Sequence, residues 1–202
     1  MSPGPAIRAV LWDADGVLQR HGGDWRSAYA GLGLADGFLE ELWAVEVPLM
    51  TGGDFPAAVA DVARRHRVDA PVEALLAPWR SIEPVAETLD VVGGVRAAGV
   101  RCYLATNQQE YRGTFMKQSL GYDEHLDGAF YSYEIGYAKP DPAYFRAILD
   151  ALSLDGEQVL FVDDRQANVD GAAEGGLRAE CWHHDDGVDR LRAHLARHGL
   201  AA

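Results

Sequence analysis

The sequence predicts an α/β protein built on a parallel sheet that is covered by helices on both faces. Short apolar runs of strand length recur along the chain, and from about residue 85 they alternate with segments of helical periodicity. These runs lack the polar alternation of half-exposed strands, as expected of strands buried on both faces. With 202 residues, of which 48% are hydrophobic, the chain is long and apolar enough to bury such a core.

The first strand is expected over residues 6–12, and a polar motif follows it directly. Asp13 and Asp15 lie one residue apart, and Gly16 comes next. Glycine permits a sharp exit at the carboxyl end of a strand, where open α/β sheets bind ligands. Two carboxylates there repel each other and are costly to desolvate, and a metal ion would relieve both problems. Oxygen ligands suit Mg²⁺, although an Asp-Gly pair is also common in simple turns.

Residues 20–83 interrupt the α/β pattern with an expected helical insertion. Four helices and no strand are expected there. The helices are expected over residues 24–32, 36–47, 54–66 and 71–80. Pro48 is expected to end the second helix, because proline cannot continue the hydrogen-bonding pattern. We therefore divide the chain into a core of residues 1–19 and 84–202 and an inserted domain of residues 20–83.

The rest of the chain alternates between helices and strands. Helices are expected over residues 88–98, 110–120, 142–152, 166–175 and 188–197, and strands over residues 100–105, 129–133, 158–162 and 179–182. Further polar signals follow these strands or lie in the loop beyond one: Thr106 with Asn107, Lys139, and Asp163 with Asp164. Because the carboxyl ends of parallel strands share one edge of a sheet, we expect these groups to converge with the first aspartate motif.

The composition of this predicted cluster suits phosphoryl transfer. Four carboxylates require compensating positive charge, which Mg²⁺ and Lys139 would supply. The hydroxyl of Thr106 and backbone amides at Thr106 and Asn107 can hold three phosphate oxygens. In phosphoryl transfer, positioning and charge neutralisation do most of the catalytic work.

The overall charge argues against two classes of partner. The net charge is −13 and the sequence pI is about 4.8, which disfavours binding to nucleic acid or to an anionic membrane. No apolar run approaches 18 residues, and the N-terminus lacks the basic start and apolar core of a signal peptide, so we expect a cytoplasmic protein. Cys102 and Cys181 are isolated in strand-like runs and are expected to be free thiols.

The order of the motifs resembles that of the haloacid dehalogenase-like hydrolases. Asp-x-Asp-Gly-Val, Thr-Asn, Lys-Pro and Val-Asp-Asp occur in this order, with Asn168 four residues after the last aspartate, and the pattern spans residues 7–176. A helical insertion between the first two motifs resembles the type 1 cap of subfamily I. The resemblance implies a Rossmann-like core with strand order 5-4-1-2-3 and a mobile cap over the site.

The resemblance also implies a role for each catalytic residue. Asp13 would be the nucleophile that attacks phosphorus and forms an aspartyl-phosphate. Asp15 would protonate the leaving oxygen and then activate water. Thr106, the amide of Asn107 and Lys139 would hold the phosphoryl group, and the lysine would also neutralise the nucleophile.

The metal site is likewise implied by the resemblance. Mg²⁺ would be bound by Asp13, by the backbone carbonyl oxygen of Asp15 and by Asp164. Asp163 would act through water or through a hydrogen bond to a ligand, and Asn168 would orient the aspartates or the lysine from the following helix.

We therefore expect a Mg²⁺-dependent phosphatase that acts on a small phosphorylated metabolite as a monomer or homodimer. A sugar phosphomutase and a 2-haloacid dehalogenase of the same fold are alternatives, although relatives with dehalogenase activity generally lack the acidic residue at position 15. A non-catalytic regulatory or scaffold protein is a further alternative, but it should have lost a motif residue. A phospho-accepting receiver domain would be shorter and lack the helical insertion.

Specificity is expected to come from the insertion, where the candidates are His21, Trp25, Arg26, Trp43 and Arg80.

Overall fold

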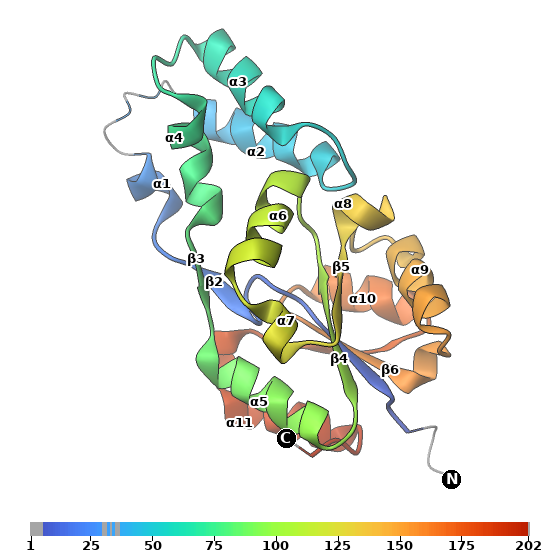
Figure 1. Ribbon diagram of the computed structural model, residues 1–202. Coiled ribbons are helices and arrows are strands. Elements are labelled where there is room, and N and C mark those ends of the chain that lie inside the picture. The colour runs from blue at the N-terminus through green and yellow to red at the C-terminus, as the bar shows by residue number, and fades with distance from the viewer. Residues whose placement is uncertain (1–5, 30–31, 33, 35–36, 202) are drawn as a thin grey trace.

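The computed structural model describes residues 6–29, 32, 34 and 37–201 of the 202-residue chain. At its centre lies a five-stranded parallel sheet in the order β5-β4-β1-β6-β7 (Figure 1). Its strands are β1 Ala9–Trp12, β4 Arg101–Thr106, β5 Gly128–Tyr131, β6 Val159–Asp163 and β7 Arg178–Cys181. Counted along the chain and read from the other edge, this is the order 5-4-1-2-3, so the expected fold class is confirmed.

The central strand β1 determines where the first aspartate motif lies. It pairs with β4 on one side and with β6 on the other. Val10 and Trp12 join the apolar cluster on one face of the sheet, and Ala9 and Leu11 join the cluster on the other face. Because both faces are covered, the strand is apolar throughout. The chain leaves the sheet at Asp13, between the ends of β4 and β6.

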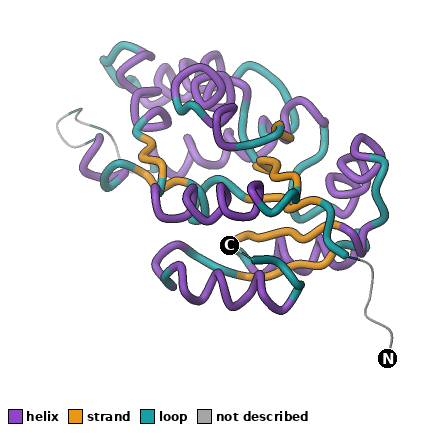
Figure 2. The backbone as a smooth tube through the Cα atoms, turned by 60° about the horizontal axis from the view of Figure 1, so that its bottom comes forward, coloured by secondary structure: helices purple, strands orange, loops and turns teal. Residues whose placement is uncertain are grey.

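Helices cover both faces of the sheet (Figure 2). One face packs against α5 Ala86–Ala97, α6 Glu110–Ser119, α7 Tyr122–His125 and α11 Val188–Arg197. The other face packs against α9 Pro142–Leu152 and α10 Gln166–Glu174. The short elements α8 Ser132–Ile135, η2 Gly156–Gln158 and η3 His184–Asp186 complete this half of the chain. None of the helices in the described ranges is both long and apolar enough to span a membrane.

The insertion between β1 and β4 is mainly helical and packs around an apolar cluster of its own. Its helices are α1 Trp25–Ala28, α2 Phe38–Leu49, α3 Phe55–His66, α4 Val72–Leu76 and the 3₁₀ helix η1 Ala77–Arg80. Figure 1 places α2, α3 and α4 beyond the end of α6, on the side of the sheet from which the chain leaves β4. Tyr111 of α6 packs against the apolar cluster of the insertion and joins the two parts.

The elements of the insertion differ in part from the sequence expectations. The strands β2 Gln19–His21 and β3 Ile82–Pro84 pair as an antiparallel ribbon, although no strand was expected. Each strand has only three residues, which is too short to show the alternating pattern of a strand in the sequence. The two strands are also far apart in the chain, so no local signal indicates that they pair. Helix α2 continues through Pro48 to Leu49, because a proline in the last turn removes only one hydrogen bond. The expected start of this helix at residue 36 lies outside the described residues.

The expected helix over residues 71–80 is also divided. It passes from α4 into η1 at Ala77, next to Pro78, which has no backbone N–H to donate. The first helix of the insertion begins after the expected N-cap Asp24, whose carboxylate accepts a hydrogen bond from Ser27 N, and it ends at Ala28. The expected residues 30 and 31 of that helix lie outside the described part of the chain.

A glycine on α10 allows this helix to approach the loop that carries Lys139. A Cβ atom at Gly171 would lie 2.0 Å from the carbonyl oxygen of Pro140, which no side chain can do without displacing the loop. Gly93 on α5 offers a contrast, because a Cβ atom there would meet nothing within 4 Å.

These two glycines should therefore respond oppositely to the same substitution. Gly171→Ala should lower the free energy of unfolding by about 1–3 kcal/mol, because the backbone must shift to accept the methyl group. Gly93→Ala should raise it by up to about 1 kcal/mol, as expected for an exposed helical glycine. Denaturant unfolding followed by circular dichroism measures both changes. An unchanged or increased stability of Gly171→Ala would contradict the close packing.

Candidate active site

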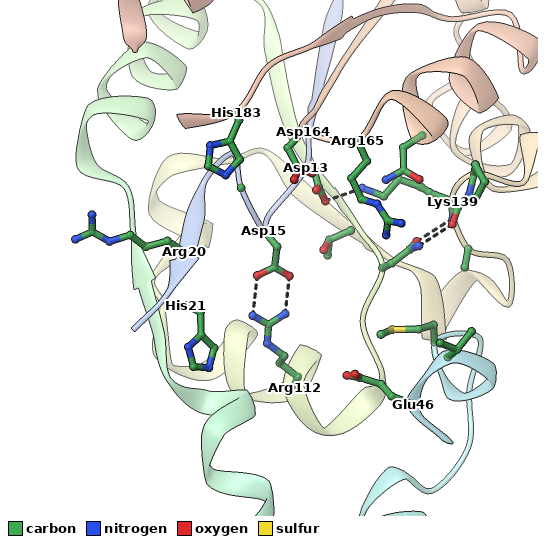
Figure 3. Close-up of a pocket in the computed structure, with 18 of the residues that line it drawn as sticks. Asp13, Asp15, Arg20, His21, Glu46, Arg112, Lys139, Asp164, Arg165 and His183 are labelled. Carbon is green, nitrogen blue, oxygen red and sulfur yellow. Dashed lines mark hydrogen bonds and ion pairs between the residues drawn. The ribbon is translucent and has the colours of Figure 1, made fainter. Parts of the chain in front are cut away.

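A cavity of about 690 Å³ lies at the carboxyl edge of the sheet, between the sheet and the insertion (Figure 3). The core lines it with the predicted motif residues Asp13, Asp15, Thr106, Asn107, Lys139, Asp164 and Asn168. Asp163 lies directly beneath, hydrogen-bonded to Lys139 and Asn168. The structure thus brings together all of the predicted motif residues.

The ammonium group of Lys139 is buried and makes three polar contacts. Its Nζ donates to Asp13 Oδ1 at 2.6 Å, to Asp163 Oδ2 at 2.7 Å and to the carbonyl oxygen of Ala105 at 2.9 Å. Burial disfavours the charged ammonium, but the two carboxylates outweigh this effect and raise the pKa of Lys139. The lysine is therefore a fixed cation that links the carboxyl ends of β1, β4 and β6.

Asn107 holds the backbone of this lysine in place. Its Nδ2 donates to the carbonyl oxygen of Lys139 at 2.8 Å, and its Oδ1 accepts from the amide of Lys139 at 2.8 Å. The side chain of Asn107 is thus engaged with the lysine loop, which leaves its backbone N–H as the group able to bind an anion. The hydroxyl of Thr106, at the end of β4, accepts a hydrogen bond from Gln108 Nε2 at 3.0 Å.

Asp163 is saturated with hydrogen bonds. Besides Lys139, it accepts from the backbone N–H of Arg165 at 2.8 Å and from Asn168 Nδ2 at 2.9 and 3.1 Å. Both of its oxygens therefore accept hydrogen bonds, and one carboxylate contacts Lys139, Arg165 and Asn168.

A divalent cation fits beside Asp13 and Asp164. One carboxylate oxygen from each of Asp13, Asp163 and Asp164 lies within 4.8 Å of the others. Burial raises the pKa of Asp13 to about 8 in spite of Lys139, and burial together with Asp163 raises the pKa of Asp164. Three carboxylates share the single ammonium of Lys139 in this cluster, so its negative charge exceeds its positive charge. Oxygen ligands with a deficit of positive charge suit Mg²⁺.

Gly16 allows Asp164 to approach the end of β1. Its φ is +81°, which favours glycine, and a Cβ atom there would lie 2.8 Å from both Cγ and Oδ2 of Asp164. The glycine in the first motif is therefore required by the backbone turn and also by the space that the last aspartate occupies.

Asp15 lies in a different environment from Asp13. Its carboxylate faces Arg112 of α6, whose Nη1 donates to Oδ2 at 2.6 Å and whose Nη2 donates to Oδ1 at 2.7 Å (Figure 3). Gln19 Nε2 and Gln108 Nε2 add hydrogen bonds at 2.9 and 3.0 Å. Desolvation alone would raise the pKa of Asp15, but Arg112 lowers it to about 2.

Arg112 is the main site residue that the sequence did not identify. It also donates from Nε to the carbonyl oxygen of Trp79 at 3.0 Å, so it connects Asp15 to the insertion. The available signal was weak: Arg112 lies on the helix that follows Thr106 and Asn107, one turn after Gln108. An arginine in a helix is usually solvent-exposed, and only its burial distinguishes this one.

Two of the five expected specificity residues line the cavity. They are His21 and Trp25, whose rings lie 4.3 Å apart. Trp43 instead packs against the apolar cluster of the insertion, and the Arg80 guanidinium lies over the ring of Tyr111 at 4.3 Å. The side chain of Arg26 lies outside the described part of the structure. Glu46, Val47, Met50 and Trp79 line the cavity from the insertion without having been predicted to do so.

Known proteins match this chain both in sequence and in structure. The family model of haloacid dehalogenase-like hydrolases matches residues 7–176. The GMP/IMP nucleotidase YrfG of Escherichia coli is 32% identical over 92 residues, which are 46% of this chain and only 41% of the nucleotidase. The D-ribitol-5-phosphate phosphatase of Bacteroides thetaiotaomicron is 23% identical over 91% of this chain and 94% of the phosphatase.

The fold is also shared with solved structures. A wild-type HAD family enzyme of Bacteroides thetaiotaomicron, in complex with magnesium and inorganic phosphate, superposes with a TM-score of 0.74 at 22% identity. The match covers 87% of this chain and 94% of that enzyme. At this level of identity, the likeness establishes the fold and not the activity.

The close approach of Gly16 to Asp164 leads to a prediction about metal binding. Gly16→Ala should displace the carboxylate of Asp164 and weaken Mg²⁺ binding by about 10- to 100-fold, measured by isothermal titration calorimetry. Gly99→Ala is the matched control, because Gly99 also has a positive φ, of +86°, but a Cβ atom there would meet nothing within 4 Å. It should cost stability without changing Mg²⁺ affinity. Equal Mg²⁺ affinity in both variants would exclude the proposed metal position.

Proposed function

This chain belongs to the haloacid dehalogenase-like hydrolase family, and we propose that it is a Mg²⁺-dependent phosphatase acting on a small phosphorylated metabolite. The observation that carries the proposal is the buried Lys139 ammonium between Asp13 and Asp163, next to the carboxylate of Asp164. It supports the assignment of an oxygen nucleophile, a fixed cation and a metal-binding carboxylate at one end of a cavity of metabolite size.

Mg²⁺ would be held by the carboxylates of Asp13 and Asp164 and by the backbone carbonyl oxygen of Asp15. When bound, it would supply positive charge to the phosphoryl oxygens. Asp163 and Asn168 would keep Lys139 and the neighbouring carboxylates in position. A structural neighbour was solved in complex with magnesium and inorganic phosphate, which supports the binding of a metal ion and a phosphoryl group by this fold.

The reaction would proceed in two steps on Asp13. The phosphoryl group is held by the hydroxyl of Thr106, the amide of Asn107 and Lys139. A carboxylate oxygen of Asp13 attacks phosphorus, the bond to the ester oxygen breaks, and an aspartyl-phosphate forms. Water then attacks phosphorus, which releases inorganic phosphate and restores the carboxylate.

Asp15 would donate a proton to the leaving oxygen in the first step and accept one from water in the second. In the described structure, both of its oxygens are hydrogen-bonded to Arg112. In this pairing Arg112 lowers the pKa of Asp15 to about 2, so the carboxylate carries no proton to donate. We infer that it turns from Arg112 toward the ester oxygen when substrate is bound, and that it then takes up from water the proton that it donates. Arg112 also contacts the carbonyl oxygen of Trp79, so a movement of the insertion could accompany this turn.

Residues 20–83 would act as the cap of the site, and residues 1–19 and 84–202 as the catalytic core. Trp25, Glu46 and Met50 line the cavity opposite the motif residues, which supports this division. The ribbon of β2 and β3 provides the two connections between the parts.

The nucleophile can be tested directly by substitution. Asp13→Asn should lower phosphate release from p-nitrophenyl phosphate by about 10³-fold or more, because it removes the attacking oxygen but preserves the shape of the side chain. Wild-type release should also disappear when EDTA removes Mg²⁺. Asp123→Asn, on the exposed surface, is the matched control and should keep wild-type activity. Turnover by Asp13→Asn at a near-wild-type rate would refute the assignment.

With a substrate that has a good leaving group, the loss of Asp15 should slow only the second step, the hydrolysis of the aspartyl-phosphate. p-Nitrophenolate leaves without needing a proton, so Asp15→Asn should still form the aspartyl-phosphate but hydrolyse it slowly. Rapid mixing should show a burst of about one p-nitrophenolate per enzyme, followed by slow turnover. Intact-protein mass spectrometry should detect the phosphorylated chain. Steady turnover of Asp15→Asn at the wild-type rate, with no burst, would exclude the acid–base role.

A further inference from the structure

We propose that Glu46 of α2 selects the leaving group, so that the preferred substrate is the phosphate ester of an uncharged, hydroxyl-rich alcohol such as a sugar or polyol. The inference rests on the proposed phosphatase function and adds the substrate class to it. It follows from the position of Glu46, from the pairing of the charges around it and from the aromatic rings beside it.

Glu46 presents one carboxylate oxygen that is fixed and one that is available. Oε1 accepts from Trp79 Nε1 at 2.6 Å and from Gln109 Nε2 at 3.4 Å, whereas Oε2 accepts no hydrogen bond from the described residues. Figure 3 shows the carboxylate pointing into the cavity from the insertion, toward Arg112 and away from the cluster around Lys139. A ligand held by its phosphate near Lys139 would therefore extend its alcohol part toward this oxygen.

The neighbouring charges disfavour a second anionic group on the substrate. Among the described cationic side chains that line the cavity, Lys139 is paired with two aspartates and Arg20 with Glu83. Arg112, which Asp15 leaves when it turns to the substrate, still has the charge of Glu46 beside it. Arg165 makes no ion pair with the described residues, but it lies beside Asp13 and Asp164, on the side of the cavity away from Glu46 (Figure 3). A carboxylate or second phosphate near Glu46 would meet a like charge without an unpaired cation beside it.

A hydroxyl group fits this position better than an ammonium group. The guanidinium of Arg112 is close enough to Glu46 to stabilise its negative charge, so a second cation would be repelled by the arginine. A hydroxyl donates a hydrogen bond to Oε2 without bringing a charge. Such a bond would compensate the desolvation that raises the pKa of Glu46.

The rings next to Glu46 suit the carbon skeleton of a polyol or sugar. Trp25 packs edge-on against Trp79 with ring centroids 4.9 Å apart, and it stacks on His21. Met50 and Val47 add further apolar surface to the lining of the cavity. Carbon-bound hydrogens of a sugar pack on aromatic and apolar surfaces, while its hydroxyls require acceptors such as Glu46.

The test compares three esters that share the phosphoryl group but differ in the alcohol. They are ribitol 5-phosphate, which is hydroxyl-rich, 2-phosphoglycolate, which carries a carboxylate, and p-nitrophenyl phosphate, which has neither. The wild-type kcat/KM should be about 100-fold higher for ribitol 5-phosphate than for 2-phosphoglycolate. Glu46→Leu should lower kcat/KM for ribitol 5-phosphate by about 10- to 100-fold and leave that for p-nitrophenyl phosphate within about threefold.

Two further variants separate charge from structure. Glu46→Gln keeps an oxygen that can accept from Trp79 but removes the charge, so it should raise kcat/KM for 2-phosphoglycolate about tenfold relative to ribitol 5-phosphate. Glu40→Gln, on the exposed face of the same helix, is the matched control and should change none of the three values.

Several results would overturn the inference. If Glu46→Leu lowered kcat/KM equally for all three esters, the role of Glu46 would be structural, through its contacts with Trp79 and Gln109, and it would not select the alcohol. A wild-type preference for 2-phosphoglycolate, or for phosphoethanolamine over ribitol 5-phosphate, would show that another charge governs selection.

If the wild type released phosphate from no ester, the proposed function itself would fail. The affinities of the esters, measured by calorimetry, would then test the inference. Tighter binding of ribitol 5-phosphate that is lost in Glu46→Leu would support it, and equal affinity for all of the esters would refute it.

Discussion

The buried ammonium of Lys139 is the interaction on which the rest of the site depends. It joins Asp13 after β1, the carbonyl oxygen of Ala105 in β4 and Asp163 at the end of β6, so one cation links three adjacent strands. Removing one partner of a buried ion pair commonly costs about 3–5 kcal/mol, because the remaining charge is left uncompensated. The surrounding structure is arranged to keep this cation in place: Asn107 binds its backbone on both sides, and Gly171 gives its loop room against α10.

The two aspartates of the first motif illustrate how environment separates chemically identical groups. Burial raises the pKa of Asp13, whereas the guanidinium of Arg112 outweighs desolvation and lowers that of Asp15. Asp13 therefore needs further positive charge to remain an anion, whereas Asp15 already has the positive charge of Arg112 beside it. Because Arg112 also contacts the carbonyl oxygen of Trp79, the state of Asp15 is physically connected to the position of the insertion.

The core and the insertion contribute different parts of the proposed activity. The motif residues at the sheet edge contain what phosphoryl transfer requires, independent of the alcohol that leaves. The insertion faces them with one carboxylate, two tryptophan rings and apolar side chains, which can discriminate between alcohols. A GMP/IMP nucleotidase and a D-ribitol-5-phosphate phosphatase both match parts of this sequence, which agrees with the proposal that the insertion selects the alcohol.

The sequence alone determined the α/β class of the core and the residues that meet at the carboxyl ends of its strands, whereas the strand order was implied by the family resemblance of the motifs. Apolar runs, helical periodicity and short motifs act locally, and a parallel sheet brings the ends of its strands together by geometry. The α11 bounds and the Asp141 cap of α9 were likewise correctly predicted. Only the tertiary structure decided the pairing of β2 with β3, the pairing of Arg112 with Asp15 and the position of Glu46. These depend on contacts between residues far apart in the chain, and neither an arginine nor a glutamate in a helix has a local pattern that distinguishes a buried partner from a solvated one.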